Sequence, residues 1–168
     1  MCMLFESLNK LDISPYNNPN CFKNQSLCLL IEKLLTYDKY FIIGGSFALA
    51  LNFNELIRCS NDLDIYCYLE DADFWLKIFK SLGFTITKSQ QGFYIRSKDK
   101  TIIDFNPILV HGREIIRVKD LGYDLRTKNI MGVNILDPEI VKYQKLAGMR
   151  QKDKFDLKHY FNIDIATD

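Results

Sequence analysis

Two acidic residues, Asp62 and Asp64, are the strongest candidates for chemistry in this chain, and they lie two positions apart in the stretch Asp-Leu-Asp-Ile-Tyr. Residues i and i+2 of a β-strand point to the same face of a sheet. Both carboxylates are therefore expected to project together, while Leu63, Ile65 and Cys67 point into the core. A pair of carboxylates on one face is suited to a Mg²⁺ ion that also binds the phosphates of its substrate.

A pair of glycines earlier in the chain offers a place for such phosphates. The apolar run Tyr40–Ile43 predicts a buried strand, after which Gly44 and Gly45 allow a tight turn with exposed amides. Ser46 is a suitable N-cap for the helix-forming run Phe47–Leu51. A helix N-terminus reached through glycines favours anions, because its free N–H groups and its dipole both attract negative charge. The two motifs together predict a site for a metal–nucleotide complex.

A third acid, Asp104, lies in the apolar stretch Lys100–Pro107, which predicts another strand. Asp is rarely buried in such surroundings without a partner, so Asp104 is a candidate for the same site. The alternative is an acid at the end of a strand, just before a turn at Asn106 and Pro107.

The order of these motifs resembles the signature of the nucleotidyltransferase superfamily related to DNA polymerase β. That signature is a strand, Gly-Gly or Gly-Ser, a helix, and then Asp-x-Asp or Asp-x-Glu on the next strand. The stretches Gly-Gly-Ser-x-Ala-Leu-Ala-Leu and Arg-x-Ser-x-Asp-Leu-Asp are most similar to the AbiEii-type branch, a minimal form of the superfamily, and to its neighbours, which include toxins and antibiotic-modifying enzymes. The resemblance implies an α/β (α+β) fold in which helices flank a mixed β-sheet. It also implies transfer of a nucleoside monophosphate from an NTP to a hydroxyl or phosphate, with Mg²⁺ or Mn²⁺ as cofactor.

The resemblance also implies roles for individual residues. Asp62 and Asp64 would bind the metal that carries the triphosphate. Asp104 would help to hold a second metal and would accept the proton of the acceptor hydroxyl or orient that hydroxyl. Arg58 and Ser60 match the Arg-x-Ser spacing ahead of the acids, so they would support the loop or touch the nucleotide.

The end of the chain is similar to a second pattern of this branch, a lysine, an apolar turn, an arginine and then Lys-Asp-x-x-Asp-Leu. By that resemblance Lys145 would approach the nucleotide phosphates, and Arg150 with Asp153 and Asp156 would brace the site. On physical grounds alone, a lysine at this spacing usually lies on a solvated face. The two acids would then simply bind Arg150 or cap the helix.

The remaining pattern predicts one nucleotidyltransferase-like domain over residues 1–168. It would comprise an N-terminal arm and helix (1–38), a sheet core (40–136) and C-terminal helices (137–168). Apolar spacing predicts helices over 4–11, 25–37 and 71–82, and further helices that begin at 137 and 151. Alternation predicts a hairpin of 84–88 and 92–96, and strands over 114–118 and 129–136 that extend the sheet antiparallel. Basic residues between 113 and 128 could line an acceptor groove, although a solvated charged loop is the commoner arrangement.

Composition limits the class of protein. A net charge of +1 provides no overall field for nucleic acid, so any basic site must be local. The chain has five cysteines, an odd number without a Cys-x-x-Cys pair, which favours reduced thiols in a cytoplasmic protein and argues against a zinc site. Its opening residues are too short for a signal peptide, and no apolar run reaches the length of a membrane span. A soluble, cytoplasmic protein with no membrane partner is expected.

Several alternatives stay open at this point. The acceptor could be tRNA, a small molecule such as an antibiotic, or a protein, and an antitoxin or another partner protein could complete the domain. The principal rival to an enzyme is a non-catalytic binding module with a nucleotidyltransferase-like fold, whose expected mark is the loss of one acid. None of the three acids is lost here.

Overall fold

The fold is organised around one mixed β-sheet. The computed structural model describes residues 2–13, 15, 18–60, 62–89, 92–98, 101–109, 116–117 and 124–165. The strands of the main sheet lie in the order β10-β11-β2-β4-β7-β6-β5. Their bounds are β2 Phe41–Ile43, β4 Leu63–Tyr68, β5 Thr85–Lys88, β6 Phe93–Arg96, β7 Ile102–Leu109, β10 Thr127–Ile130 and β11 Val133–Leu136. Neighbours are antiparallel except for the parallel pairs β11–β2 and β4–β7.

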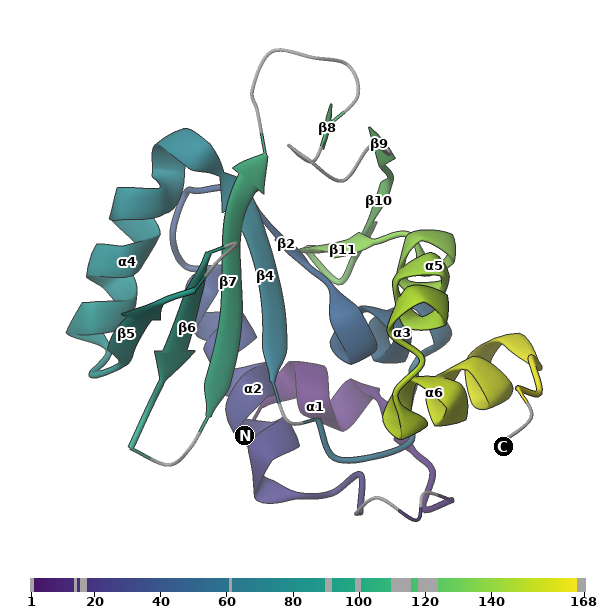
Figure 1. Ribbon diagram of the computed structural model, residues 1–168. Helices are drawn as coiled ribbons and strands as arrows, with labels where there is room; N and C mark the ends of the chain where they lie inside the picture. The colour runs from purple at the N-terminus through teal and green to yellow at the C-terminus, as the bar shows by residue number, and fades with distance from the viewer. Residues whose placement is uncertain are drawn as a thin grey trace.

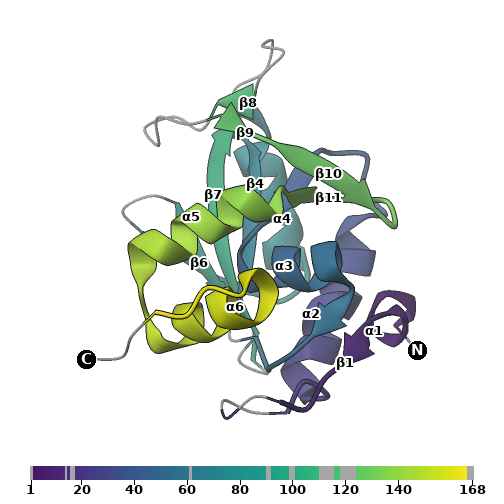
Figure 2. The ribbon, with the colours of Figure 1, turned by 90° about the vertical axis from the view of Figure 1, so that its right-hand side faces the viewer.

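Helices cover both faces of this sheet. They are α1 Met3–Ser7, α2 Phe22–Leu34, α3 Gly45–Phe53, α4 Ala72–Ser81, α5 Pro138–Gly148 and α6 Gln151–Phe161, and a short 3-10 helix, Leu69–Asp71, precedes α4. Helix α4 lies on one side of the sheet, with α3, α5 and α6 on the other (Figure 1). The quarter-turn in Figure 2 brings α5 and α6 to the front. The site described below lies on the side of α3, α5 and α6.

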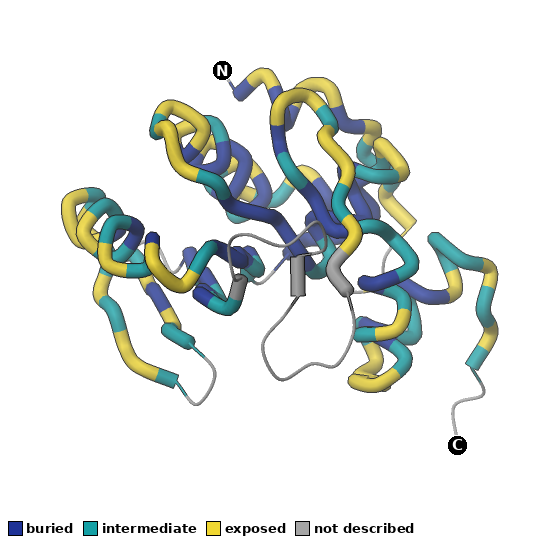
Figure 3. The backbone as a smooth tube through the Cα atoms, turned by 90° about the horizontal axis from the view of Figure 1, so that it is seen from above, coloured by how far each residue is buried: buried dark blue, intermediate teal, exposed yellow. Residues whose placement is uncertain are grey.

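The core between the sheet and α4 follows from strict alternation along the strands. Ile95, Ile103 and Phe105 are fully buried and point to the α4 side of the sheet, as the expected period of two requires. The ring of Phe79 on α4 meets that of Phe105, with 5.4 Å between the centroids. Buried segments gather in the middle of the molecule (Figure 3). The predicted inward orientation of Leu63, Ile65 and Cys67 is confirmed, because all three are buried.

The expected strands at 114–118 and 129–136 are only partly correct. Ile116–Arg117 forms β8, which pairs with β9 (Asp124–Leu125) in a separate sheet and does not extend the main one. The segment 129–136 is two strands, not one, because Met131 and Gly132 take positive φ angles of 53° and 81° and reverse the chain. Its second strand, β11, runs parallel to β2 rather than antiparallel.

The N-terminal arm also differs from its prediction. Helix α1 ends at Ser7, and Asn9–Lys10 (β1) pairs in parallel with Glu55–Leu56 (β3), the segment that follows α3. The predicted hairpin of β5 and β6 and the helices at 71–82, 137 and 151 are confirmed within a few residues at their ends. In the part of the chain that the structure describes, no helix has both the length and the apolar character needed to cross a membrane.

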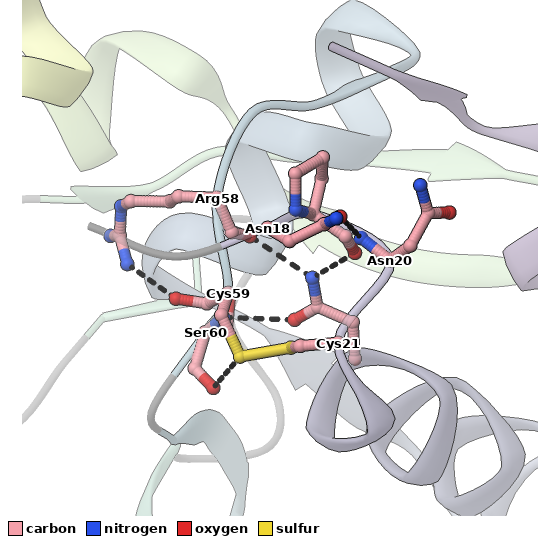
Figure 4. Close-up of a disulfide and its surroundings, with 8 residues drawn as sticks. Asn18, Asn20, Cys21, Arg58, Cys59 and Ser60 are labelled. Carbon is pink, nitrogen blue, oxygen red and sulfur yellow. Dashed lines mark hydrogen bonds between the residues drawn. A yellow bond between two sulfur atoms is a disulfide. The ribbon is translucent and has the colours of Figure 1, made fainter. Parts of the chain in front are cut away.

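The cysteines contradict the expectation of fully reduced thiols. Cys21, the residue just before α2, forms a disulfide with Cys59 across 38 positions of sequence (Figure 4). The three remaining cysteines, Cys2, Cys28 and Cys67, are free and buried. Cysteine usage therefore no longer favours the cytoplasm, and a cytoplasmic location stays a prediction.

Removing this disulfide should lower stability substantially. The bond closes a loop of 38 positions, and by the loop-entropy argument a cross-link of that span stabilises a fold by about 4 kcal/mol. We therefore expect the paired replacement of Cys21 and Cys59 by Ser to lower the free energy of unfolding by up to that amount in urea titrations. Wild type in a reducing agent should match the variant. Equal urea midpoints for the oxidised protein and the variant would contradict the prediction.

Candidate active site

The turn between β2 and α3 is shaped by two glycines. Gly45 has a φ of +59°, and a Cβ at this position would lie 1.8 Å from Oδ2 of Asp64. Gly44 is the residue that precedes the helix, and a Cβ there would lie 2.5 Å from Cε2 of Tyr66. Both positions need glycine because the backbone passes so closely over β4. The helix begins at Gly45, so the expectation that Ser46 caps it is wrong: Ser46 lies within the first turn.

Three carboxylates lie beside this turn. Asp64 on β4 and Asp104 on β7 are register partners in the parallel pair, so their side chains share a face of the sheet. Asp62 precedes β4, and its charge acts on both of them. The alternative for Asp104, an acid at the end of a strand, is wrong because β7 continues through Asn106 to Leu109. The tertiary fold thus brings together the three acids that the sequence singled out.

The electrostatics of this group resemble those of a cation site. Burial, and then the negative charges of Asp62 and Asp104, raise the pKa of Asp64 to about 7. Burial also raises the pKa of Asp104, although a hydrogen bond from Asn106 opposes the rise. Carboxylates that disfavour each other's ionisation are stabilised by a bound cation. The nearby cationic side chains therefore do not fully neutralise the negative charge of the three carboxylates.

The donor set fits a metal ion that also binds the substrate. Among the described residues, no group of three or more acidic, histidine or cysteine side chains is arranged so that it could hold a metal ion. Mg²⁺ is usually held by one or two carboxylates together with the substrate's phosphates, so Asp62 and Asp64 would suffice when a nucleotide is present. The role of Asp104 as a ligand remains a prediction.

A buried ion network fixes α6 against the start of α3. The carboxylate of Asp156 accepts two hydrogen bonds from Arg58, from Nε and Nη2, each at 2.7 Å. It also lies 2.6 Å from Nζ of Lys145. The Ser46 hydroxyl accepts hydrogen bonds from Arg58 and, at 3.2 Å, from Lys145. Arg58 and Lys145 are only 4% and 5% exposed. Both cations therefore bind protein groups, and a contact of either with the nucleotide stays a prediction.

The first turn of α6 extends this network. Asp153 is fully buried, accepts a hydrogen bond from Lys145 at 3.2 Å and another from Nε of Arg150 at 2.6 Å. It also accepts from the backbone N–H of Arg150, which supplies the carboxylate half of a capping box at the start of the helix. Asp153 thus binds Arg150, as the prediction on physical grounds alone allowed. Asp156 instead binds Arg58 and Lys145.

Breaking the Arg58–Asp156 pair should cost far more than breaking an exposed one. Arg58→Met leaves a buried carboxylate with one cation fewer, which typically costs about 3–5 kcal/mol. Lys39→Met is the matched control, because Lys39 and Asp71 are also 2.7 Å apart but the lysine is 41% exposed, so we expect a much smaller loss. The measurement is the free energy of unfolding in urea. Equal losses in the two variants would contradict this account.

One cation near the acids had no role in the sequence reasoning. Lys152 lies in the first turn of α6. Its positive charge, like that of Lys145, opposes the rise in the pKa of Asp64. No described residue forms an ion pair with Lys152, so its ammonium group is available to a substrate. It stands in the Lys-Asp-x-x-Asp-Leu pattern, but only the tertiary structure places it near β4.

Other predicted residues lie elsewhere. Ser60 is buried, and its backbone N–H donates to Oδ1 of Asn24 at 2.8 Å, which ties the segment before Asp62 to α2 (Figure 4). Of the basic residues considered for an acceptor groove, Arg113 and Lys119 lie outside the described residues. Lys128 is exposed and lies 3.9 Å from Asp137.

Solved structures with the same arrangement are nucleotidyltransferases. The lincosamide antibiotic adenylyltransferase LnuA, solved with lincomycin bound, superposes with a TM-score of 0.62 and 13% identity over 89% of this chain and 96% of that chain. The antibiotic-resistance factor ANT(2'')-Ia superposes with a TM-score of 0.61 and 17% identity over 76% of this chain and 73% of that chain. A candidate nucleotidyltransferase from Helicobacter pylori superposes with a TM-score of 0.55 and 22% identity over 82% of this chain and 68% of that chain. No protein-family model and no curated protein sequence matches the chain.

The chain has the nucleotidyltransferase fold. The resemblance drawn from the glycine pair and the Asp-x-Asp motif is confirmed at the level of this fold. Its AbiEii-type branch stays a prediction.

Proposed function

We propose that the protein transfers a nucleoside monophosphate from an NTP to an acceptor hydroxyl and releases pyrophosphate. The observation that carries this proposal is the register of Asp64 against Asp104, directly beside the glycine turn at the start of α3. Phosphoryl transfer needs mainly positioning and charge neutralisation, which carboxylates, backbone amides and a lysine supply together.

The residues would divide the work as follows. The free amides at the start of α3 and the ammonium group of Lys152 bind the β- and γ-phosphates. Asp62 and Asp64 hold Mg²⁺ or Mn²⁺, which when bound neutralises the charge that develops on the triphosphate. Asp104 accepts the proton of the acceptor hydroxyl. The hydroxyl oxygen then bonds to the α-phosphorus, and the bond from that phosphorus to the bridging oxygen breaks.

The buried network has a supporting role in this scheme. Arg58, Lys145 and Asp156 hold α6, the helix that carries Lys152, against Ser46. LnuA and ANT(2'')-Ia are an antibiotic adenylyltransferase and an antibiotic-resistance factor, which supports a hydroxyl on a small molecule as one class of acceptor. The role as a toxin, with an antitoxin as partner, rests on the sequence resemblance alone.

Calorimetric titration of each NTP, with and without Mg²⁺, tests the proposal. We expect wild type to bind one or more NTPs only with Mg²⁺, and Asp62→Asn to lose that binding. Asp73→Asn is the control, because this exposed acid lies in the first turn of α4, on the other side of the sheet. No NTP binding by wild type would overturn the proposal and would favour the non-catalytic binding module.

A further inference from the structure

One face of the sheet is exposed along β5 and β6, next to half-buried residues of β7. Strand alternation places Phe93 and Ile95 toward α4 and Tyr94 and Arg96 on the opposite face. Tyr94, on the strand next to the edge of the sheet, is 44% exposed. Arg96 and its register partner Thr85 on β5 are exposed as well.

This exposed face continues directly from the carboxylates. Tyr94 is the register partner of Asp104, which is the register partner of Asp64. Thr87 on β5 is the partner of Tyr94 and extends the row to the edge of the sheet. Partners on neighbouring strands have Cβ atoms about 5 Å apart, so the side chains of Tyr94 and Asp104 start side by side on the same face. The row Asp64, Asp104, Tyr94, Thr87 thus runs away from the glycine turn.

The geometry of the proposed transfer decides which substrate would lie on this row. In phosphoryl transfer the attacking and leaving oxygens lie roughly in line on opposite sides of the phosphorus. If pyrophosphate leaves toward the start of α3, the acceptor must approach from the β7 and β6 side. Its approach passes over Tyr94 and Arg96.

We propose that Tyr94 and Arg96 form the acceptor subsite, and that the acceptor is a nucleotide with a free hydroxyl. This inference rests on the proposed function. The ring of Tyr94 stacks on the planar base, as exposed aromatic side chains on sheets do in proteins that bind single-stranded RNA. Arg96, two positions along on the same face, neutralises a phosphate. The nucleotide can be free or can be the end of an RNA strand, since both present the same base, hydroxyl and phosphate.

Binding of two probes in the absence of NTP and Mg²⁺ tests this subsite apart from catalysis. The probes are a ribonucleoside 5′-monophosphate and a short single-stranded oligoribonucleotide, and their affinities are measured by NMR titration. Tyr94→Ala should weaken binding by about 10-fold or more, because base–aromatic stacking has that effect. Tyr94→Phe keeps the ring and should bind as wild type does. Arg96→Ala should weaken binding and reduce its dependence on salt.

Two matched controls lie on other surfaces. Tyr143→Ala removes a tyrosine of α5 that is 61% exposed, and Lys80→Ala removes an exposed cation of α4, on the opposite side of the sheet. Neither variant should change the affinity for the probes. Calorimetry of NTP with Mg²⁺ on Tyr94→Ala should match wild type, because the donor lies on the other side of the acids.

The results distinguish a free nucleotide from an RNA end, and they distinguish failure of the subsite from failure of the proposed transferase activity. Tighter binding of the oligonucleotide than of the mononucleotide, lost in Tyr94→Ala, supports an RNA end, and equal binding with the same loss supports a free nucleotide. Equal affinity of wild type and Tyr94→Ala, or no binding of either probe to wild type, overturns the subsite even where NTP binds. Weaker NTP binding in Tyr94→Ala would place the ring in the site for the NTP donor and would also overturn the acceptor subsite. Probe binding that depends on Tyr94, in a protein that binds no NTP, would instead overturn the transferase and keep the subsite.

Discussion

Asp64→Asn should abolish nucleotidyl transfer and at the same time stabilise the protein. The carboxylate lies between Gly45 and Asp104, where it would bind the metal, so its loss should reduce kcat by at least about a thousand-fold. Its pKa is raised to about 7, first by burial and then by Asp62 and Asp104, so the ionised form destabilises the native state when no cation is bound. A neutral amide of the same shape removes that cost. The measurements are turnover with Mg²⁺ and unfolding with a chelator.

The stability difference should depend on pH in a defined window. An acid whose pKa is higher in the folded state keeps its proton after the unfolded chain has lost it, so wild type loses stability as pH rises from about 4 to about 7. The variant lacks this group, so its advantage should grow across that window and stay constant above it. The buried carboxylate of Asp156 acts in the opposite sense, because hydrogen bonds from Arg58 and the charge of Lys145 outweigh burial and lower its pKa. That contribution is lost in both proteins as pH falls below about 4 and cancels in the difference. A constant difference across the whole range would contradict the assigned environment of Asp64.

Gly45→Ala should eliminate activity nearly as completely, by displacing the same carboxylate. The new Cβ would lie 1.8 Å from Oδ2 and 2.9 Å from Cγ of Asp64, so the acid would have to rotate away from its position beside Asp104. The residue would also hold a φ of +59°, which costs an L-residue about 1–2 kcal/mol. We expect turnover to fall at least about a hundred-fold, together with a loss of stability.

Gly83→Ala separates these two effects. Gly83 also has a positive φ, 84°, but no atom lies within 4 Å of the position a Cβ would take. This control should lose a similar 1–2 kcal/mol of stability, about the cost of a left-handed residue, and should keep wild-type kcat. If Gly45→Ala lost no more activity than Gly83→Ala, the close contact with Asp64 would have no functional weight.

The parts of the site that depend only on neighbouring residues could be predicted from the amino-acid sequence. Glycine chemistry predicted the turn after β2, and the period of two along a strand predicted that Asp62 and Asp64 project together, because both depend only on neighbouring residues. The start of α5 was readable for the same reason: Asp137 caps this helix through a hydrogen bond from the N–H of Glu139 at 2.9 Å. The order of these local signals resembles the nucleotidyltransferase signature, and that resemblance implied the fold.

Which distant groups meet depends on the fold of the whole chain and could not be predicted locally. Asp104 became a member of the site because β7 pairs in parallel with β4 in a register that sets Asp104 against Asp64. Arg58 and Lys145 have the charge expected of nucleotide ligands, yet in the fold they lie buried against Asp156 and Ser46. An ammonium or guanidinium group binds whichever acceptor the packing brings near it, and no local pattern encodes a partner about a hundred positions away.

The disulfide and the exposed face of β6 were decided in the same way. Cysteine spacing does not reveal that Cys21 reaches Cys59, because pairing depends on the path of the chain between α2 and the segment before β4. Alternation along 92–96 predicted that Tyr94 and Arg96 share a face, but not that this face stays exposed beside Asp104. Which face of a strand is covered depends on where the helices pack, and that is a property of the whole fold.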